Sequence, residues 1–372
     1  EPPATATDRA TPQVWEGWAA SLFLLGSWTA SRVPFEAAFA GYLDQGPLPD
    51  AVRIAARLVG MLEGMDLKPA ATGWEGRAER LLKRHGPCRE VGYLALARTG
   101  CEIPDPTELL ARAERALAVS LTYADLNLQT RALADKGLAL VSQGSVEEGM
   151  ALLDEAALAI NAGEVSDRQA AGLVMCSMLS ASVRAGDVPR AEVWADLLLN
   201  EATTSTTPPI LQMHAQVALS AALAASGRWR EAEAELTEAL TRPKDFVCHM
   251  LKAKAEYASL RLRQGRTQEA AAVLNGVEDH LEVVEPYARI LIAHGHLGQA
   301  GQRLRTAILT LGTDRMRTAP LLALLVDLHV QSGDLSAAQG ELDRLQNLAA
   351  ACPSKEIGAQ AYLAAGRLAH AQ

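Results

Sequence analysis

The stretch "ASGRWREAEAELTEAL" (residues 225–240) decides the fold. Gly227 comes directly before a run of small and apolar residues at helical spacing, namely Ala232, Leu236 and Ala239. Positions i, i+4 and i+7 share one face of an α-helix, so the run predicts a helix with one apolar face. A glycine at this point favours the end of a preceding helix, because it adopts the left-handed conformation of a helix C-terminus without strain. The stretch therefore predicts a helix, a tight turn and a second helix.

The same pattern recurs along the chain. Six turn glycines, spaced 42, 41, 38, 30 and 38 residues apart, are Gly144, Gly186, Gly227, Gly265, Gly295 and Gly333. Five positions after each comes a small residue, which would let the two helices approach closely: Gly149, Ala191, Ala232, Ala270, Ala300 and Ala338. The tetratricopeptide repeat (TPR) has a period of about 34 residues, so these repeats are TPR-like with mostly longer connections. We predict an α-solenoid of TPR-like antiparallel helix pairs that form a right-handed superhelix.

Composition agrees with an all-α fold. Apolar residues make up 49% of the 372 residues but aromatic ones only 4%, so alanine and leucine must fill the interior. Both residues favour helices, and the extended β-branched runs of strands are missing.

Residues 1–104 repeat less clearly and are interpreted as divergent N-terminal helical pairs. Residues 105–372 are interpreted as the TPR-like repeat domain.

Charge and hydropathy argue against nucleic-acid and membrane binding. The net charge is −9, and the basic residues form no stripe that would bind a phosphate backbone. No apolar stretch approaches the roughly 20 residues that a membrane helix needs. The five cysteines are odd in number and widely spaced, which predicts reduced thiols and a cytoplasmic location: Cys88, Cys101, Cys176, Cys248 and Cys352.

One region carries a closer likeness. Residues 133–196 include "GLALVSQGSVEEGMALLDEA", the connection "AGEVSD" and a helix rich in small residues. This region resembles the helical-repeat region of large bacterial LuxR-type transcriptional regulators, and "LRLRQGRTQEAAAVL" (260–274) resembles a later repeat. The likeness covers roughly residues 105–350. It implies a sensor or coupling domain, with DNA bound by a separate C-terminal helix-turn-helix.

The end of the sequence departs from that pattern. After the repeat at Gly333 only "SKEIGAQAYLAAGRLAHAQ" (354–372) remains, which predicts one helix without a partner or a DNA-binding module. Repeat proteins normally cap such an apolar face. We therefore expect the native chain to continue beyond Gln372, with a stand-alone relative as the alternative.

No sequence motif indicates catalysis, a cofactor or a metal. "GSVEEGMA" (144–151) has the glycine spacing of a phosphate-binding loop but lacks its lysine and hydroxyl residue. His294 and His296, or Cys248 with His249, supply fewer ligands than the three or four that zinc takes. No nucleophile, base and orienting group stand in a recognisable arrangement. We expect a protein that is not an enzyme.

The remaining candidate site is the concave face of the solenoid, which the first helix of each pair would line. Counting back from the turn glycines by the repeat offsets places eight residues there: Arg131, Cys176, Ser180, His214, Lys252, Ser259, Arg289 and Asp327. The alternative is that these are ordinary solvated positions. Some TPR domains clamp chaperone tails with lysines and asparagines at set concave positions. That carboxylate clamp is absent from this set, which argues against a co-chaperone.

Three functions remain open from the sequence. The first is a sensor domain of a LuxR-type regulator that binds a small effector molecule or a protein or peptide partner on its concave face. The second is a stand-alone TPR scaffold that joins proteins. The third is a binding protein for a small apolar ligand.

Overall fold

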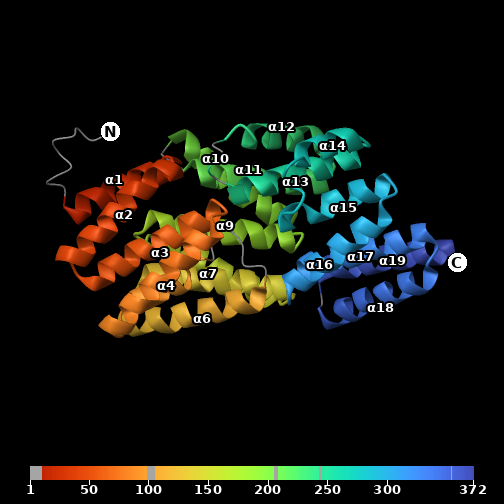
Figure 1. Cartoon of the computed structure of the whole chain (residues 1–372). Helices are drawn as coiled ribbons and strands as arrows, with labels where there is room; N and C mark the ends of the chain where they lie inside the picture. The colour runs from red at the N-terminus through yellow and green to blue at the C-terminus, as the bar shows by residue number, and fades with distance from the viewer. Residues whose placement is uncertain (1–10, 99–104, 205–207, 243–244, 246, 353) are drawn as a thin grey trace.

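The chain is an α-solenoid in the computed structural model, which describes residues 11–98, 105–204, 208–242, 245, 247–352 and 354–372. Helices follow one another as antiparallel pairs along the molecule, and the described residues contain no strand (Figure 1). The predicted all-α class and TPR-like solenoid are confirmed. No helix in these ranges is both long and apolar enough to cross a bilayer.

The N-terminal region, which lacks the regular glycine pattern, also folds as helical pairs. Its helices are α1 (Pro12–Leu24), α2 (Trp28–Gln45), α3 (Leu48–Gly64), α4 (Lys68–His85) and α5 (Glu90–Ala95). Helix α6 (Pro106–Tyr123) is the first of the region predicted as the repeat domain. The predicted boundary between residues 104 and 105 adjoins residues 99–104, which lie outside the described residues, as does Cys101. The division into two domains stays a prediction.

The repeats follow in regular order. The first helices of the pairs are α7 (Leu126–Gln143), α9 (Arg168–Arg184), α11 (Pro209–Ala225), α13 (Val247–Arg263), α15 (Val284–Ala293), α17 (Arg315–Ser332) and the unpaired α19 (Lys355–Ala371). The second helices are α8 (Val146–Asn161), α10 (Val188–Thr204), α12 (Trp229–Ala239), α14 (Thr267–Leu274), α16 (Leu297–Leu311) and α18 (Leu335–Ala351). A single 3₁₀ turn, η2 (Leu281–Val283), precedes α15.

The turns within the pairs have the geometry that glycine favours. All six repeat glycines have φ between 67° and 96°, in the left-handed region. The small residues after them are buried, with Ala232, Ala270 and Ala300 each 0% exposed. A Cβ atom added at Gly149 would lie 2.5 Å from the carbonyl oxygen of Gly137 on the preceding helix. The small residues therefore lie where the two helices of a pair come into close contact.

The solenoid curls far enough for distant repeats to touch. Helix α17 packs on α7, and α13 contacts α3. The Asp105 carboxylate accepts a hydrogen bond of 2.7 Å from the Thr313 hydroxyl, and the Cys352 thiol lies 3.4 Å from the carbonyl oxygen of Gly144. Both contacts join residues 208 positions apart. One superhelical turn thus lies against the next, which encloses part of the inner face.

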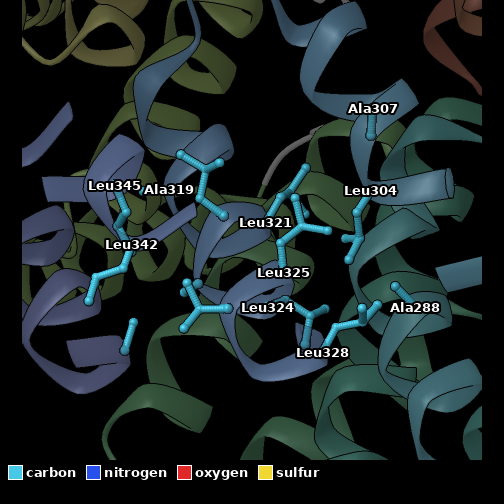
Figure 2. Close-up of a cluster of buried hydrophobic side chains, with 14 of the residues drawn as sticks. Ala288, Leu304, Ala307, Ala319, Leu321, Leu324, Leu325, Leu328, Leu342 and Leu345 are labelled. Carbon is cyan, nitrogen blue, oxygen red and sulfur yellow. The ribbon is translucent and has the colours of Figure 1, made fainter. Parts of the chain in front are cut away.

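The apolar cores follow this arrangement. One cluster combines α1–α4 with residues of α11 and α13, such as Met213 and Ala253, so the N-terminal helices are held against the middle of the solenoid. A second cluster fills the C-terminal end with leucine and alanine from α15 to α19 (Figure 2). The space between these two ends is where polar side chains become buried.

Candidate functional site

A cavity of about 490 Å³ opens on the inner face of the solenoid. Its walls come from the end of α1, the start of α2, the end of α6, from α3, α5, α7, α9 and the first turn of α11, from the loops before α7 and α9, and from His249 on α13. Much of the wall is apolar, with Phe23, Trp28 and Leu211 among the lining residues. The volume lies within the range of small-molecule and cofactor sites in proteins, roughly 300–1,000 Å³.

The cavity wall carries more positive than negative charge, although the whole chain carries −9. Three carboxylates line it, Asp125, Glu164 and Asp167, against five arginines, Arg53, Arg57, Arg89, Arg131 and Arg168. Two of the carboxylates are already engaged: Asp125 caps α7 and accepts a hydrogen bond of 3.0 Å from the Tyr93 hydroxyl, and Asp167 caps α9. Arginines thus outnumber carboxylates in the cavity wall, although Arg53 and Arg89 have carboxylate partners of their own.

Two of these arginines are open to a ligand. Arg53 is tied to Glu16 and Asp50, and Arg89 to Glu90. Neither Arg57 nor Arg168 forms an ion pair with any residue that the structure describes. Arg57 is half-buried on α3 and Arg168 is exposed at the start of α9. A guanidinium group in such a position is suited to binding a carboxylate.

A buried polar network lies beside the cavity. The Arg131 guanidinium donates a hydrogen bond to the carbonyl oxygen of Leu96 and lies 3.9 Å from the Asp135 carboxylate. Asp135 is only 3% exposed and accepts a hydrogen bond of 3.0 Å from the Ser177 hydroxyl on α9. Burial lowers the pKa of Arg131, and the Asp135 carboxylate opposes that shift. The network connects α7 to α5 and α9 and fixes the position of Arg131 in the cavity wall.

Two histidines are buried side by side between α11 and α13. The rings of His214 and His249 meet edge to face, with their centroids 5.1 Å apart. Nε2 of His214 lies 3.1 Å from the Cys176 carbonyl oxygen and 3.5 Å from the Ser180 hydroxyl. Burial, together with the positive charge of Lys252, lowers the pKa of His214 to about 3 and that of His249 well below its usual value. Both imidazoles are therefore neutral at physiological pH.

The structure brings only part of the predicted concave set together. Arg131 and Cys176 line the cavity, with Ser180 and His214 in contact behind Cys176, and Lys252 acts electrostatically on both histidines. The other three predicted residues are not among those that line the cavity.

Those three residues lie elsewhere on the first helices. Arg289 on α15 forms an ion pair of 2.9 Å with Glu285, and Asp327 on α17 forms one with Arg367 on α19. Ser259 is half-buried on α13. Ion pairing of this kind is typical of the solvated positions that were the alternative reading of the set.

Several lining residues were not predicted. Arg57 belongs to the N-terminal region, where no repeat offset marks the inner face. His249 was considered only with its neighbour Cys248, yet the fold places it beside His214 on the preceding first helix. The signal that would have found it is the spacing of one repeat between His214 and His249.

Comparison with known proteins supports the fold and leaves the family open. No model of a known protein family matches the sequence, and no curated protein matches it. The chain is a TPR-like helical-repeat protein. It is similar to the solved structure of a Rap protein complexed with competence and sporulation factor, with a TM-score of 0.50 and 12% sequence identity over 96% of this chain and 92% of that chain.

A second solved structure is the APC/C hetero-tetramer Cut9–Hcn1, with a TM-score of 0.35 and 14% identity over 99% of this chain and 84% of that chain. At such levels of identity the likeness to the Rap structure concerns the fold alone.

Proposed function

We propose that this chain is a non-catalytic sensor domain that binds a carboxylate-bearing peptide in the cavity of its inner face. The observation that carries the proposal is the pairing of an apolar cavity of about 490 Å³ with Arg57 and Arg168, whose guanidinium groups have no ion-pair partner among the described residues. Apolar walls would hold side chains of the ligand, and the arginines would bind a terminal or side-chain carboxylate.

The Rap structure lends support at the level of the fold. That protein was solved in complex with competence and sporulation factor. A solenoid with this fold therefore accommodates that factor as a ligand. In the present chain the residues proposed to make the contacts are taken from its own cavity.

The proposal is tested with a pool of short peptides that have free C-terminal carboxylates and with the same pool amidated. We expect the purified protein to retain members of the free pool and to lose affinity for their amidated forms. Replacing Arg57 by methionine keeps the apolar stem but removes the charge, and we expect it to weaken binding about tenfold or more, as for the loss of a charged hydrogen bond.

Arg115 on α6 provides the matched control, because it is exposed and does not line the cavity. Arg115→Met should bind like the parent protein. Equal retention of free and amidated peptides, or equal effects of the two arginine replacements, would contradict a carboxylate site at Arg57.

We further propose that the binding domain belongs to a LuxR-type transcriptional regulator in a bacterial cytoplasm. The support is the resemblance of residues 133–196 to the repeat region of those proteins. The native coding sequence after Gln372 tests this proposal. A helix-turn-helix segment there supports it, and a stop codon directly after Gln372 contradicts it.

A stand-alone scaffold is the alternative function, and one observation favours it. Tyr362 and Leu363 on the unpaired helix α19 are 83% and 61% exposed, which is unusual for large apolar side chains. A protein partner would bury them. Native mass spectrometry of the protein purified from its host separates the alternatives, because a retained protein, peptide or small apolar molecule would each add a characteristic mass.

A further inference from the structure

Three potential metal ligands come together in the cavity wall. Cys176, His214 and His249 each offer a ligand atom, and these atoms all lie within 4.8 Å of one another. The residues belong to the consecutive first helices α9, α11 and α13 and are 38 and 35 positions apart, close to one repeat each. They lie 10, 13 and 16 positions before the turn glycines Gly186, Gly227 and Gly265, so each is about one helical turn further from its glycine than the one before. The sequence analysis predicted no metal site from this spacing.

We propose that Cys176, His214 and His249 bind a zinc ion whose fourth coordination position faces the cavity. Cys176 and His249 line the cavity, and His214 is buried behind them. A site with three protein ligands and one open position is the arrangement in which zinc binds water or a further ligand.

The donor set selects the metal. Thiolate and imidazole suit zinc, whereas magnesium and calcium take oxygen ligands. Zinc bonds of about 2.0–2.3 Å in tetrahedral geometry place ligand atoms roughly 3.5 Å apart, so side-chain movements of about 1 Å would close the site. Cys176 is half-buried beside the cavity, which leaves its side chain room for such a movement.

Hydrogen bonds hold both imidazole rings in place. Nε2 of His214 lies 3.1 Å from the carbonyl oxygen of Cys176, and because a carbonyl oxygen only accepts, Nε2 carries the proton. The lone pair that a metal needs is then on Nδ1. Nδ1 of His249 lies 3.0 Å from the Cys248 sulfur, which leaves Nε2 of that ring for a metal. Such partners orient the histidine ligands of known metal sites.

The local charge is compatible with a cation once the thiol is deprotonated. Histidine binds metal in its neutral form and cysteine as the thiolate. Lys252 places a positive charge near both rings, and the Cys176 thiolate would offset it together with one charge of the ion. Lys252 therefore limits the affinity without occupying a ligand position.

The test uses zinc alone with the full chain. The protein is stripped of metal, and zinc is titrated in competition with a chromogenic chelator. We expect one ion per chain, and Cys176→Ser, which removes a ligand and keeps the size, should lower the affinity by at least about 100-fold. Cobalt(II) as the probe should give a thiolate charge-transfer band that Cys176→Ser abolishes.

Two further variants separate a metal site from general disruption. Cys88→Ser removes another buried thiol outside the cluster and should leave zinc binding unchanged. Lys252→Met removes the neighbouring positive charge and should raise the affinity several-fold, roughly tenfold at most, an effect opposite to that of the ligand replacement. Circular dichroism confirms that each variant is folded.

Failure of this proposal is distinct from failure of the peptide proposal, because no peptide is present. Absence of stoichiometric zinc at micromolar concentration would overturn it. Equal zinc affinity of Cys176→Ser and the parent protein, or a cobalt spectrum without a thiolate band, would also overturn it.

Discussion

The middle of the solenoid and its C-terminal end use the same helix pairs but fill them differently. In the middle, the first helices α7, α9, α11 and α13 bury many polar side chains, among them Asp135, Ser177, His214, His249 and Arg261. Among the described residues of α15–α19 and their caps, the buried side chains are mostly leucine, alanine and other apolar residues (Figure 2). The buried polar residues there are Asp314, which caps α17, and Thr318.

This difference separates a binding region from a supporting one. A buried polar group costs free energy unless its hydrogen bonds are satisfied, so a solenoid built only for stability would use leucine throughout. Arg131, Cys176 and His249 of these helices line the cavity, where a ligand or a metal would offset part of that cost. The C-terminal end gains stability from apolar packing and holds the middle in shape through the contact of α17 with α7.

The largest effect is expected in the supporting end. Leu325 on α17 is 0% exposed and lies within the leucine cluster (Figure 2). Leu325→Ala should lower the free energy of unfolding by about 2–5 kcal/mol, because it removes apolar contacts and leaves a space that the helices cannot fill. Urea unfolding followed by circular dichroism measures the loss.

The control for this change is Leu309→Ala on α16, where the leucine is 82% exposed. Its effect should stay within about 0.5 kcal/mol, as for other surface replacements. Similar effects of the two replacements would show that the leucine cluster does not carry the stability of this end.

A second effect should appear in the close packing that both regions share. Ala232 is 0% exposed between α11 and α12, and Ala232→Trp should cost roughly 1–3 kcal/mol by overpacking the helix pair. Ala234 lies two positions further on the same helix and is exposed. Ala234→Trp should leave the thermal midpoint nearly unchanged, and a larger loss from this variant would mean that the repeats are wrongly aligned.

The repeated part of the fold was predictable because it depends on local rules. A glycine before an amphipathic run and a small residue five positions later specify one helix pair wherever they occur, as at Gly227 and Ala232. Stacking of such pairs follows from their apolar faces. The sequence therefore predicted both the class of fold and the position of each repeat turn.

The cavity was less predictable because it forms between distant segments. Arg57 on α3 lines the same cavity as Arg131 and Cys176, and no spacing rule relates these residues. The position of His249 beside His214 was also not predicted, although these two residues are closer in sequence. Its partner His214 is one repeat away, so a search for ligands close in sequence leaves the pair unnoticed.

The pH dependence of stability tests the middle region through a buried carboxyl group. Burial raises the pKa of Glu256 on α13 to about 7, with Arg263 opposing the shift and the nearby carboxylates of Glu285 and Glu282 adding to it. The folded state then binds a proton more tightly than the unfolded state, so this residue costs stability as the pH rises from about 4.5 to 7.

Replacing Glu256 by glutamine should remove that cost. We expect Glu256→Gln to raise the free energy of unfolding by about 1–2 kcal/mol at pH 8 and to have little effect near pH 4.5. Thermal unfolding across this pH range provides the measurement, with the exposed Glu79→Gln on α4 as control. Parallel pH profiles for the parent protein and Glu256→Gln would show that Glu256 ionises in the folded state as it does in the unfolded chain.

The smallest expected effect is a difference between two buried serines of α9, Ser177 and Ser182. This difference bears most directly on the comparison of the middle region with the C-terminal end. The Ser177 hydroxyl on α9 donates a hydrogen bond of 3.0 Å to the Asp135 carboxylate on α7, whereas the Ser182 hydroxyl bonds to the carbonyl oxygen of Met178 within its own helix. Ser177→Ala should cost about 1 kcal/mol, because a buried carboxylate loses a donor. Ser182→Ala should be nearly neutral, because that carbonyl group keeps its place in the helix. Chemical unfolding of the two variants measures the difference. If the two variants lose equal stability, the hydrogen bond between Ser177 and Asp135 contributes no more than a bond within one helix. The contrast between the middle region and the leucine-filled end would then not support a binding role for the middle region.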